Sequence, residues 1–323
     1  MSDLFSLEAN VPANKFDRLT VDVPELYRKF PVEPGASWYL SAMDRYRSGS
    51  SRLFACQAIP FSWRHRAWTL LRKSGIESSW FDVFRMYWSK ILGGRPLWGV
   101  EDLHFLANLF RMRFQTAEGP QSTDSDGHLA AWQQPVVLHQ LLHLVRMEIL
   151  NDHTHYIRLA RKWHPGARTF LEFGCGTAPI LTARWNFYRL PEEMQFCFAD
   201  IETLAFHYAA YRFGSLANCT PLPLVPQNAF ALTEENRFDV AFCIAVFEHL
   251  PAPLETIRQL HAALKPGGIL LFDYIKSDAA GFDTRSGLEQ RPAVLEYVGR
   301  NFELLSGVLE AGANTGTVVV RKR

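Results

Sequence analysis

The sequence predicts an α/β fold: a doubly wound sheet in the second half of the chain, joined to a helical N-terminal domain. From Thr169 onward, short apolar segments alternate with segments of helical spacing, the pattern of a parallel sheet with crossover helices. Between Pro24 and Arg113, aromatic and aliphatic residues recur at helical spacing, with breaks at glycine and proline residues. We therefore expect a helical domain over residues 1–134 and an α/β domain over residues 135–323.

Composition limits the classes of function. The 323 residues suffice for two domains, and 34 basic against 33 acidic residues leave a charge of +1, which argues against a nucleic-acid partner or an anionic membrane surface. The five cysteines form no C-x-x-C pair, and no segment approaches the roughly 20 apolar residues that span a bilayer. We expect a soluble, cytoplasmic protein with a small-molecule partner; its oligomeric state is not indicated.

The elements of the first half lead into a linker. Seven of the nine tryptophans precede residue 150, and we interpret them as the core of the helical domain rather than as a ligand-binding surface. Residues 116–128 are dense in Gly, Pro, Ser and Asp, which predicts a flexible loop. Apolar residues at helical spacing then predict a helix or a helix pair over 135–163, with Pro135 in the first turn.

The second half divides into alternating strands and helices. Short apolar runs bounded by turn residues predict strands at 169–173, 195–199, 238–243, 268–274, 302–308 and 316–321. Helical spacing between these runs predicts helices at 179–188, 203–213, 253–264 and 290–299.

A glycine loop, GCGTAP over residues 174–179, joins the first of these strands to its helix. Doubly wound folds bind ligands at this place, beyond the carboxyl end of a strand. Because Pro179 occupies the third glycine position of G-x-G-x-x-G, an NAD or FAD site is disfavoured, and the absence of G-K-[ST] excludes a P-loop. An ordinary strand-to-helix turn is the structural alternative for Gly174 and Gly176.

An acidic residue follows the second strand. Asp200 lies 24 residues after Gly176, about where a carboxylate meets the ribose hydroxyls in nucleotide-binding βαβ units. The alternative is that Asp200 caps the helix that begins near Thr203, since aspartate is a favoured N-cap residue.

Four features occur in a fixed order across about 100 residues: the loop EFGCGTA at 172–178, Asp200, the segment FDVAFCIAVFEHL at 238–250, and the turn LKPGG at 264–268. In order and spacing they resemble the class I (Rossmann-like) S-adenosylmethionine-dependent methyltransferases of the small-molecule type. The resemblance covers roughly residues 170–323. Ala178 stands where that family has its last loop glycine.

The resemblance implies a seven-stranded sheet whose last strand, TVVVRKR, is antiparallel, and S-adenosylmethionine as the cofactor. Glu172 would place negative charge near this cationic ligand. The residues implied to bind the cofactor are Glu172, Gly174, Cys175, Gly176, Asp200, Ile201, Cys243 and Ala245. The implied reaction is methyl transfer to a small-molecule acceptor, such as a sugar or other polar metabolite. The N-terminal domain would cover the carboxyl ends of the strands and help to shape the acceptor site.

His249 is the candidate catalytic residue. It follows the fourth strand, near the place where cofactor and acceptor should meet, and histidine is suited to proton removal at neutral pH. The alternative is that His249 only hydrogen-bonds the cofactor or the adjoining loop.

Three other functions compete with this interpretation: a nucleotide-sugar or NAD-linked oxidoreductase, a cofactor-binding module without transfer activity, and a nucleic-acid methyltransferase. The charge balance and the lack of an N-P-P-[YF] loop argue against the last of these. His139 and His143 lie four residues apart but without an H-E-x-x-H pattern, so no metal site is expected.

Overall fold

The computed structural model describes residues 78–93, 103, 107, 137–150, 153–188, 190–225, 232, 235–275, 283–310 and 315–323. Most of the expected helical domain over 1–134 lies outside the described residues, as do its loop at 116–128 and the boundary with the α/β domain. That division of the chain therefore stays a prediction. None of the described helices combines the length and apolar character needed to cross a bilayer.

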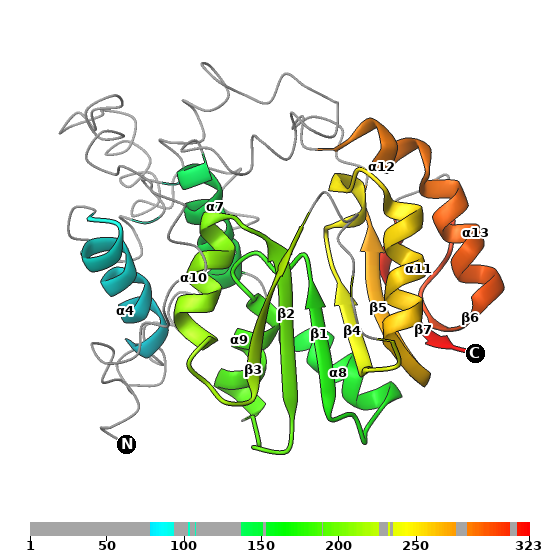
Figure 1. Cartoon of the computed structure of the whole chain (residues 1–323), viewed down its shortest axis with the longest axis horizontal. Coiled ribbons are helices and arrows are strands. Elements are labelled where there is room, and N and C mark those ends of the chain that lie inside the picture. Colours follow the sequence, from blue (N-terminus) through cyan, green and yellow to red (C-terminus); the bar gives the residue numbers. More distant parts are fainter. Residues whose placement is uncertain are drawn as a thin grey trace, which may run out of the picture.

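A seven-stranded sheet lies at the centre of the described structure (Figure 1). Its strands are β1 (Thr169–Phe173), β2 (Gln195–Ile201), β3 (Cys219–Leu224), β4 (Phe238–Cys243), β5 (Leu264–Tyr274), β6 (Phe302–Ser306) and β7 (Thr315–Lys322). Their spatial order is β3-β2-β1-β4-β5-β7-β6, and β7 runs antiparallel to both of its neighbours. The predicted doubly wound sheet with an antiparallel last strand is confirmed.

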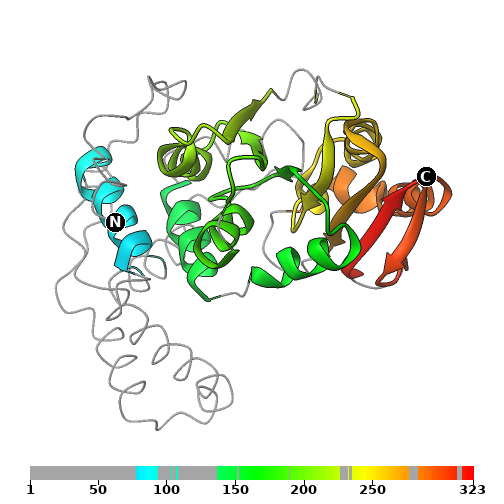
Figure 2. The same ribbon diagram turned by 90° about the horizontal axis from the view of Figure 1, so that it is seen from below.

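Helices cover both faces of this sheet (Figure 2). The helices of the α/β half are α7 (Val137–Leu150), α8 (Thr154–Trp163), α9 (Pro179–Tyr188), α10 (Leu204–Phe213), α11 (Pro253–Ala263), α12 (Arg285–Glu289) and α13 (Arg291–Asn301), with a short 3-10 helix, η4 (Phe247–His249). Successive residues of β1 alternate between two cores: Phe170 packs with α8, α9 and α10, whereas Leu171 and Phe173 pack with α11 and α13. The helix pair predicted over 135–163 is α7 and α8.

Strand β3 is an element that the sequence analysis did not predict. Its sequence, CTPLPL, contains Pro221 and Pro223, and proline has no N–H to donate to a strand ladder. β3 lies at the edge of the sheet and pairs only with β2. An edge strand tolerates prolines whose nitrogens face away from the neighbouring strand. Pro221 and Pro223 are therefore compatible with a strand at this position, although prolines argue against a strand in the middle of a sheet.

The described part of the N-terminal half consists of α4 (Ser78–Met86) and a π-helical turn, η1 (Tyr87–Ile91), beside α10 (Figure 1). The buried Tyr87 hydroxyl lies 2.5 Å from His207 Nδ1 of α10. The rings of Phe84 and Tyr87 also contact the ring of Tyr208. Trp88 is fully buried, as the core interpretation of the tryptophans expects.

Candidate functional site

The order of the strands reverses beside β1. β1 pairs with β2 on one side and with β4 on the other, and all three strands run parallel. The loops that follow them therefore leave from the same edge of the sheet, at the switch point where open α/β sheets bind ligands. The candidate site consists of these loops.

The loop after β1 has a left-handed backbone at both predicted glycines, with φ +65° at Gly174 and φ +52° at Gly176. A Cβ atom on Gly174 would overlap Val246 Cγ2, in the loop after β4. Only glycine therefore permits this approach of the two loops. A Cβ on Gly176 would lie 3.2 Å from Leu144 Cδ1 of α7. Ala178, in place of the last loop glycine, also has a positive φ of 57°.

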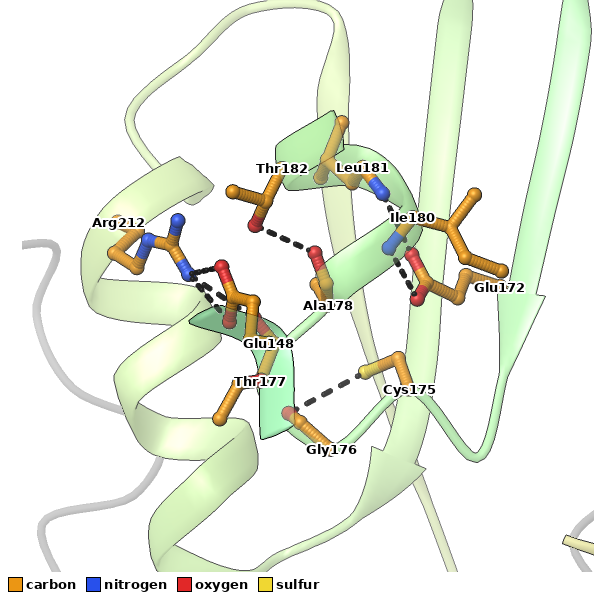
Figure 3. Close-up of polar contacts among 10 residues, drawn as sticks. All are labelled: Glu148, Glu172, Cys175, Gly176, Thr177, Ala178, Ile180, Leu181, Thr182 and Arg212. Carbon is orange, nitrogen blue, oxygen red and sulfur yellow. Dashed lines mark hydrogen bonds and ion pairs between the residues drawn. The ribbon is translucent and has the colours of Figure 1, made fainter. Parts of the chain in front are cut away.

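Glu172 binds the start of the helix that follows the loop (Figure 3). Its two carboxylate oxygens each accept a hydrogen bond of 3.0 Å, one from the backbone N–H of Ile180 and one from that of Leu181. Backbone N–H groups in the first turn of a helix have no partner within the helix, so this contact satisfies two of them. Burial raises the pKa of Glu172 to about 8, although both N–H groups favour the anion. The expected electrostatic role of Glu172 towards a cofactor stays a prediction.

Asp200 links the glycine loop to the end of β2. Its Oδ2 accepts a 2.6 Å hydrogen bond from Gly176 N–H, and its Oδ1 accepts one of 2.7 Å from Ile201 N–H. Burial raises the pKa of Asp200 to about 6 against the effect of these two donors. The N-cap of α10 is Thr203, whose hydroxyl accepts from Phe206 N–H at 3.1 Å. The helix-cap alternative for Asp200 is therefore excluded.

The other residues expected at the cofactor site contribute mainly through their backbones. Cys175 N–H donates to Ala199 O at 3.1 Å, which attaches the loop to β2. Ile201 and Cys243 place their side chains in the core on the α11 side of the sheet. Burial raises the pKa of the Cys175 and Cys243 thiols well above the ordinary value, so both remain uncharged near neutral pH.

The loop after β4 is held by a carboxylate from the next strand. Ala245 is exposed, has a positive φ of 55°, and donates its N–H to Asp273 Oδ1 of β5 at 2.5 Å. Glu248, in η4, is only 3% exposed, and its Oε2 has no hydrogen-bond partner among the described residues. Burial, with smaller contributions from Asp273 and Asp283, raises the pKa of Glu248 to about 8.

His249 lies at the end of η4 with 27% of its side chain exposed. Its Nε2 is 3.9 Å from Glu248 Oε1, and its Nδ1 is 3.9 Å from Asp283 Oδ1. Thr284 fixes this turn from the side of α12, because its N–H donates to Glu248 O at 2.9 Å and its hydroxyl donates to Leu250 O at 2.7 Å. The imidazole is thus partly open to solvent on a turn whose backbone is fixed.

The sequence analysis missed three charged residues beside the loops. Asp273 interrupts the apolar run LLFDY, a signal that could have marked it. Glu148 and Arg212 form a buried ion pair between α7 and α10, with Arg212 Nη1 2.9 Å from Glu148 Oε1. The same nitrogen lies 3.4 Å from Thr177 O in the glycine loop. The available signals were that Arg212 is the one charged residue of α10 and that Glu148 is the one acidic residue of α7.

A metal site needs several histidine, cysteine or carboxylate side chains close together. In the described part of the chain, no three such groups are arranged so that they could hold an ion. The side chain of His139 lies outside that part. The expectation that the protein has no metal site stays a prediction.

The fold and the site together define a doubly wound α/β domain. At the switch point of its sheet lie a glycine loop, after β1, and an acidic residue, at the end of β2. Residues 146–298 match a family described as a methyltransferase domain. The second half of the chain is therefore a class I S-adenosylmethionine-dependent methyltransferase domain. S-adenosylmethionine is the cofactor of such domains.

Individual relatives match smaller parts of the chain. A tRNA U34 carboxymethyltransferase of Helicobacter acinonychis is 48% identical over 44 residues, 14% of this chain and 17% of that protein. A ubiquinone biosynthesis O-methyltransferase of Azotobacter vinelandii is 35% identical over 54 residues, 17% of this chain and 23% of that protein. Each match thus spans less than a quarter of the relative. A solved SAM dependent methyltransferase from Aquifex aeolicus is 19% identical, with 57% of this chain and 97% of that chain covered and a TM-score of 0.42.

Proposed function

We propose that this protein transfers a methyl group from S-adenosylmethionine to a small-molecule acceptor, such as a sugar or other polar metabolite. The observation that carries the proposal is the loop after β1. Its glycines leave the backbone without side chains at two left-handed positions, and Asp200 lies in hydrogen-bond contact with that loop. A cationic cofactor with ribose hydroxyls fits a carboxylate at this place.

Different residues of the site would make different contacts with the cofactor. Gly174, Cys175 and Gly176 would line it with backbone, which permits a close approach. Each oxygen of Asp200 accepts one backbone hydrogen bond and keeps a lone pair for a ribose hydroxyl. Glu172 would act indirectly by fixing the start of α9. Ile201, Cys243 and Ala245 would contribute backbone contacts at the ends of β2 and β4.

The cofactor supplies a methyl group activated by a sulfonium charge, so the chain mainly has to align the acceptor and exclude water. An acceptor hydroxyl or ammonium must also lose a proton. We propose His249 as the base that receives it, since its imidazole is partly exposed and lies on a turn fixed by Thr284. Because the pKa of Glu248 is about 8, its carboxyl is mostly uncharged at neutral pH. It would therefore add little negative charge beside His249.

Calorimetry of the purified chain with S-adenosylmethionine and with S-adenosylhomocysteine tests cofactor binding. We expect both to bind, and Asp200→Ala to weaken binding by about 1–3 kcal/mol, the usual range for losing hydrogen bonds to a charged group. Thr203→Ala is the matched control, because it removes the N-cap of α10 and should lower stability without changing affinity. A wild-type protein that binds neither ligand, or that binds NAD instead, would contradict the proposal.

The role of His249 is tested with His249→Ala once an acceptor has been found by screening sugars, other polar metabolites and tRNA. A catalytic base predicts a turnover rate lower by about 100-fold or more with little change in cofactor affinity. A purely structural role predicts weaker cofactor binding, with most of the rate restored at saturating cofactor. Cofactor binding without turnover on any acceptor would favour a binding module, and turnover only on tRNA would replace the small-molecule acceptor.

The division of the chain belongs to the proposal as well. The helical domain over 1–134 would cover the carboxyl ends of the strands and complete the acceptor site of the domain over 135–323. The contact of α4 and η1 with α10 supports an N-terminal half that packs beside the cofactor loop.

A further inference from the structure

Helix α7 precedes the sheet, and the family match begins within it, at residue 146. Leu144 and Glu148 lie four residues apart and so project from the same face of this helix. Leu144 approaches Gly176, since a Cβ on that glycine would be 3.2 Å from Leu144 Cδ1. Glu148 reaches the neighbouring Thr177 through Arg212. One face of α7 therefore acts on two successive residues of the glycine loop.

The ion pair between Glu148 and Arg212 is almost completely removed from water. Arg212 Nη1 lies 2.9 Å and 3.2 Å from the two oxygens of Glu148, and the side chains are 6% and 4% exposed for Arg212 and Glu148. The same Nη1 donates to Thr177 O at 3.4 Å (Figure 3). Since apolar residues of similar volume stabilise a core as well as a buried ion pair does, stability alone does not explain these charges.

A second set of contacts fixes Arg212 from the N-terminal side. Its guanidinium lies over the ring of Tyr208, 5.1 Å from the centroid. Tyr208 in turn contacts Phe84 of α4 and Tyr87 of η1, with ring centroids 5.4 Å and 4.9 Å away. The carbonyl of Thr177 is therefore bound by a guanidinium that both α7 and the N-terminal segment hold in place.

We propose that Glu148 and Arg212 are positioning residues for the cofactor. Arg212 holds Thr177 O, and this contact fixes the peptide between Thr177 and Ala178, which leads into the left-handed Ala178. Glu148 holds Arg212 and compensates its charge. The inference rests on the proposed function, because it assumes that the cofactor binds at this loop.

The test is the double variant Glu148→Leu/Arg212→Met, which removes both charges and leaves apolar side chains of similar length. We expect a similar thermal unfolding midpoint, about tenfold weaker binding of S-adenosylhomocysteine by calorimetry, and faster amide hydrogen exchange at residues 174–178. The same two substitutions in the exposed pair of α13, Glu296→Leu/Arg300→Met, are the matched control. The control should leave both affinity and exchange unchanged.

Wild-type affinity in the folded double variant would overturn the inference, whereas a wild-type protein that does not bind the ligand would overturn the proposed function instead. If the double variant does not fold, Arg212→Lys decides. Lysine keeps a positive charge beside Glu148, but its ammonium ends one bond short of Nη1 and lacks the planar guanidinium that lies over the Tyr208 ring. Several-fold weaker binding at an unchanged unfolding midpoint would support the positioning role, and unchanged binding would contradict it.

Discussion

The loops after β1 and β4 differ in how their carboxylates are used, although they leave adjacent strands and touch each other at Gly174 and Val246. In the first loop, all four oxygens of Glu172 and Asp200 accept backbone hydrogen bonds of 2.6–3.0 Å. In the second, Asp273 holds Ala245, but Glu248 Oε2 has no partner among the described residues.

We propose that this difference separates a loop that binds the cofactor from a loop that faces the acceptor. Carboxylates whose oxygens are bonded to backbone N–H groups fix the shape of the first loop before any ligand arrives, which lowers the cost of binding an invariant cofactor. A buried carboxyl oxygen without a partner is costly, because no hydrogen bond offsets its removal from water. Under the proposed function, the loop after β4, with Glu248 and the partly exposed His249, is the one that would face the acceptor.

Gly174→Val should give the largest effect, because it forces a branched side chain into the contact between the loops. The Cβ would meet Val246, and φ +65° is strained for any L side chain. We expect about 2–5 kcal/mol of lost stability in urea or thermal unfolding, together with loss of cofactor binding. Gly299→Ala in α13, where nothing lies within 4 Å of the added Cβ, is the control and should be neutral or slightly stabilising.

Combining Gly174→Ala with Val246→Ala separates the two causes. The second substitution removes the methyl groups that a Cβ on Gly174 would meet, so it should restore part of the stability that Gly174→Ala loses. The backbone strain at φ +65° should remain. If Val246→Ala restores nothing, the two loops do not meet as described.

An element could be predicted from the sequence when the residues that specify it are contiguous in the chain. β1 and β4 were predicted with the observed bounds, because an apolar run ending at a turn residue contains the whole signal. β3 was missed because its prolines are acceptable only at the edge of a sheet, and position in a sheet is a property of the fold.

The contacts of the candidate site also fall into two groups, those within one βαβ unit and those between elements far apart in the sequence. The glycine loop and Asp200 lie in one βαβ unit, so their spacing alone indicates a ligand site. Arg212 and Glu148 are 64 residues apart, and Asp273 and Ala245 are 28 apart. Their contacts depend on the packing of α7 against α10 and of β5 against β4, which no short motif encodes.

The same substitution at two glutamates, Glu172→Gln and Glu248→Gln, should have unequal effects on stability. At Glu172 an amide presents its NH2 to one of two backbone donors, so we expect a loss of about 1–3 kcal/mol. At Glu248, whose Oε2 has no hydrogen-bond partner among the described residues, the amide loses no hydrogen bond at that atom, so we expect a smaller loss than at Glu172. Equal losses in chemical denaturation would mean that the two loops do not differ as proposed.

Glu248 should also make the stability of the protein depend on pH. The pKa of Glu248 is raised to about 8 in the folded chain, from an ordinary value near 4.5. Between these values the folded state binds more protons than the unfolded state, so stability falls as pH rises through this window. One such group contributes at most about 1.4 kcal/mol per pH unit.

We therefore expect the free energy of unfolding, measured in urea from pH 5 to pH 8, to decline less steeply in Glu248→Gln than in the wild type. Glu296→Gln, in an exposed pair, should leave the slope unchanged. Glu172→Gln also removes a carboxyl whose pKa is raised to about 8, but it lowers stability at every pH because an acceptor is lost. A wild-type slope retained in Glu248→Gln would show that Glu248 is ionised throughout this range, and the contrast between the two loops would then rest on hydrogen bonding alone.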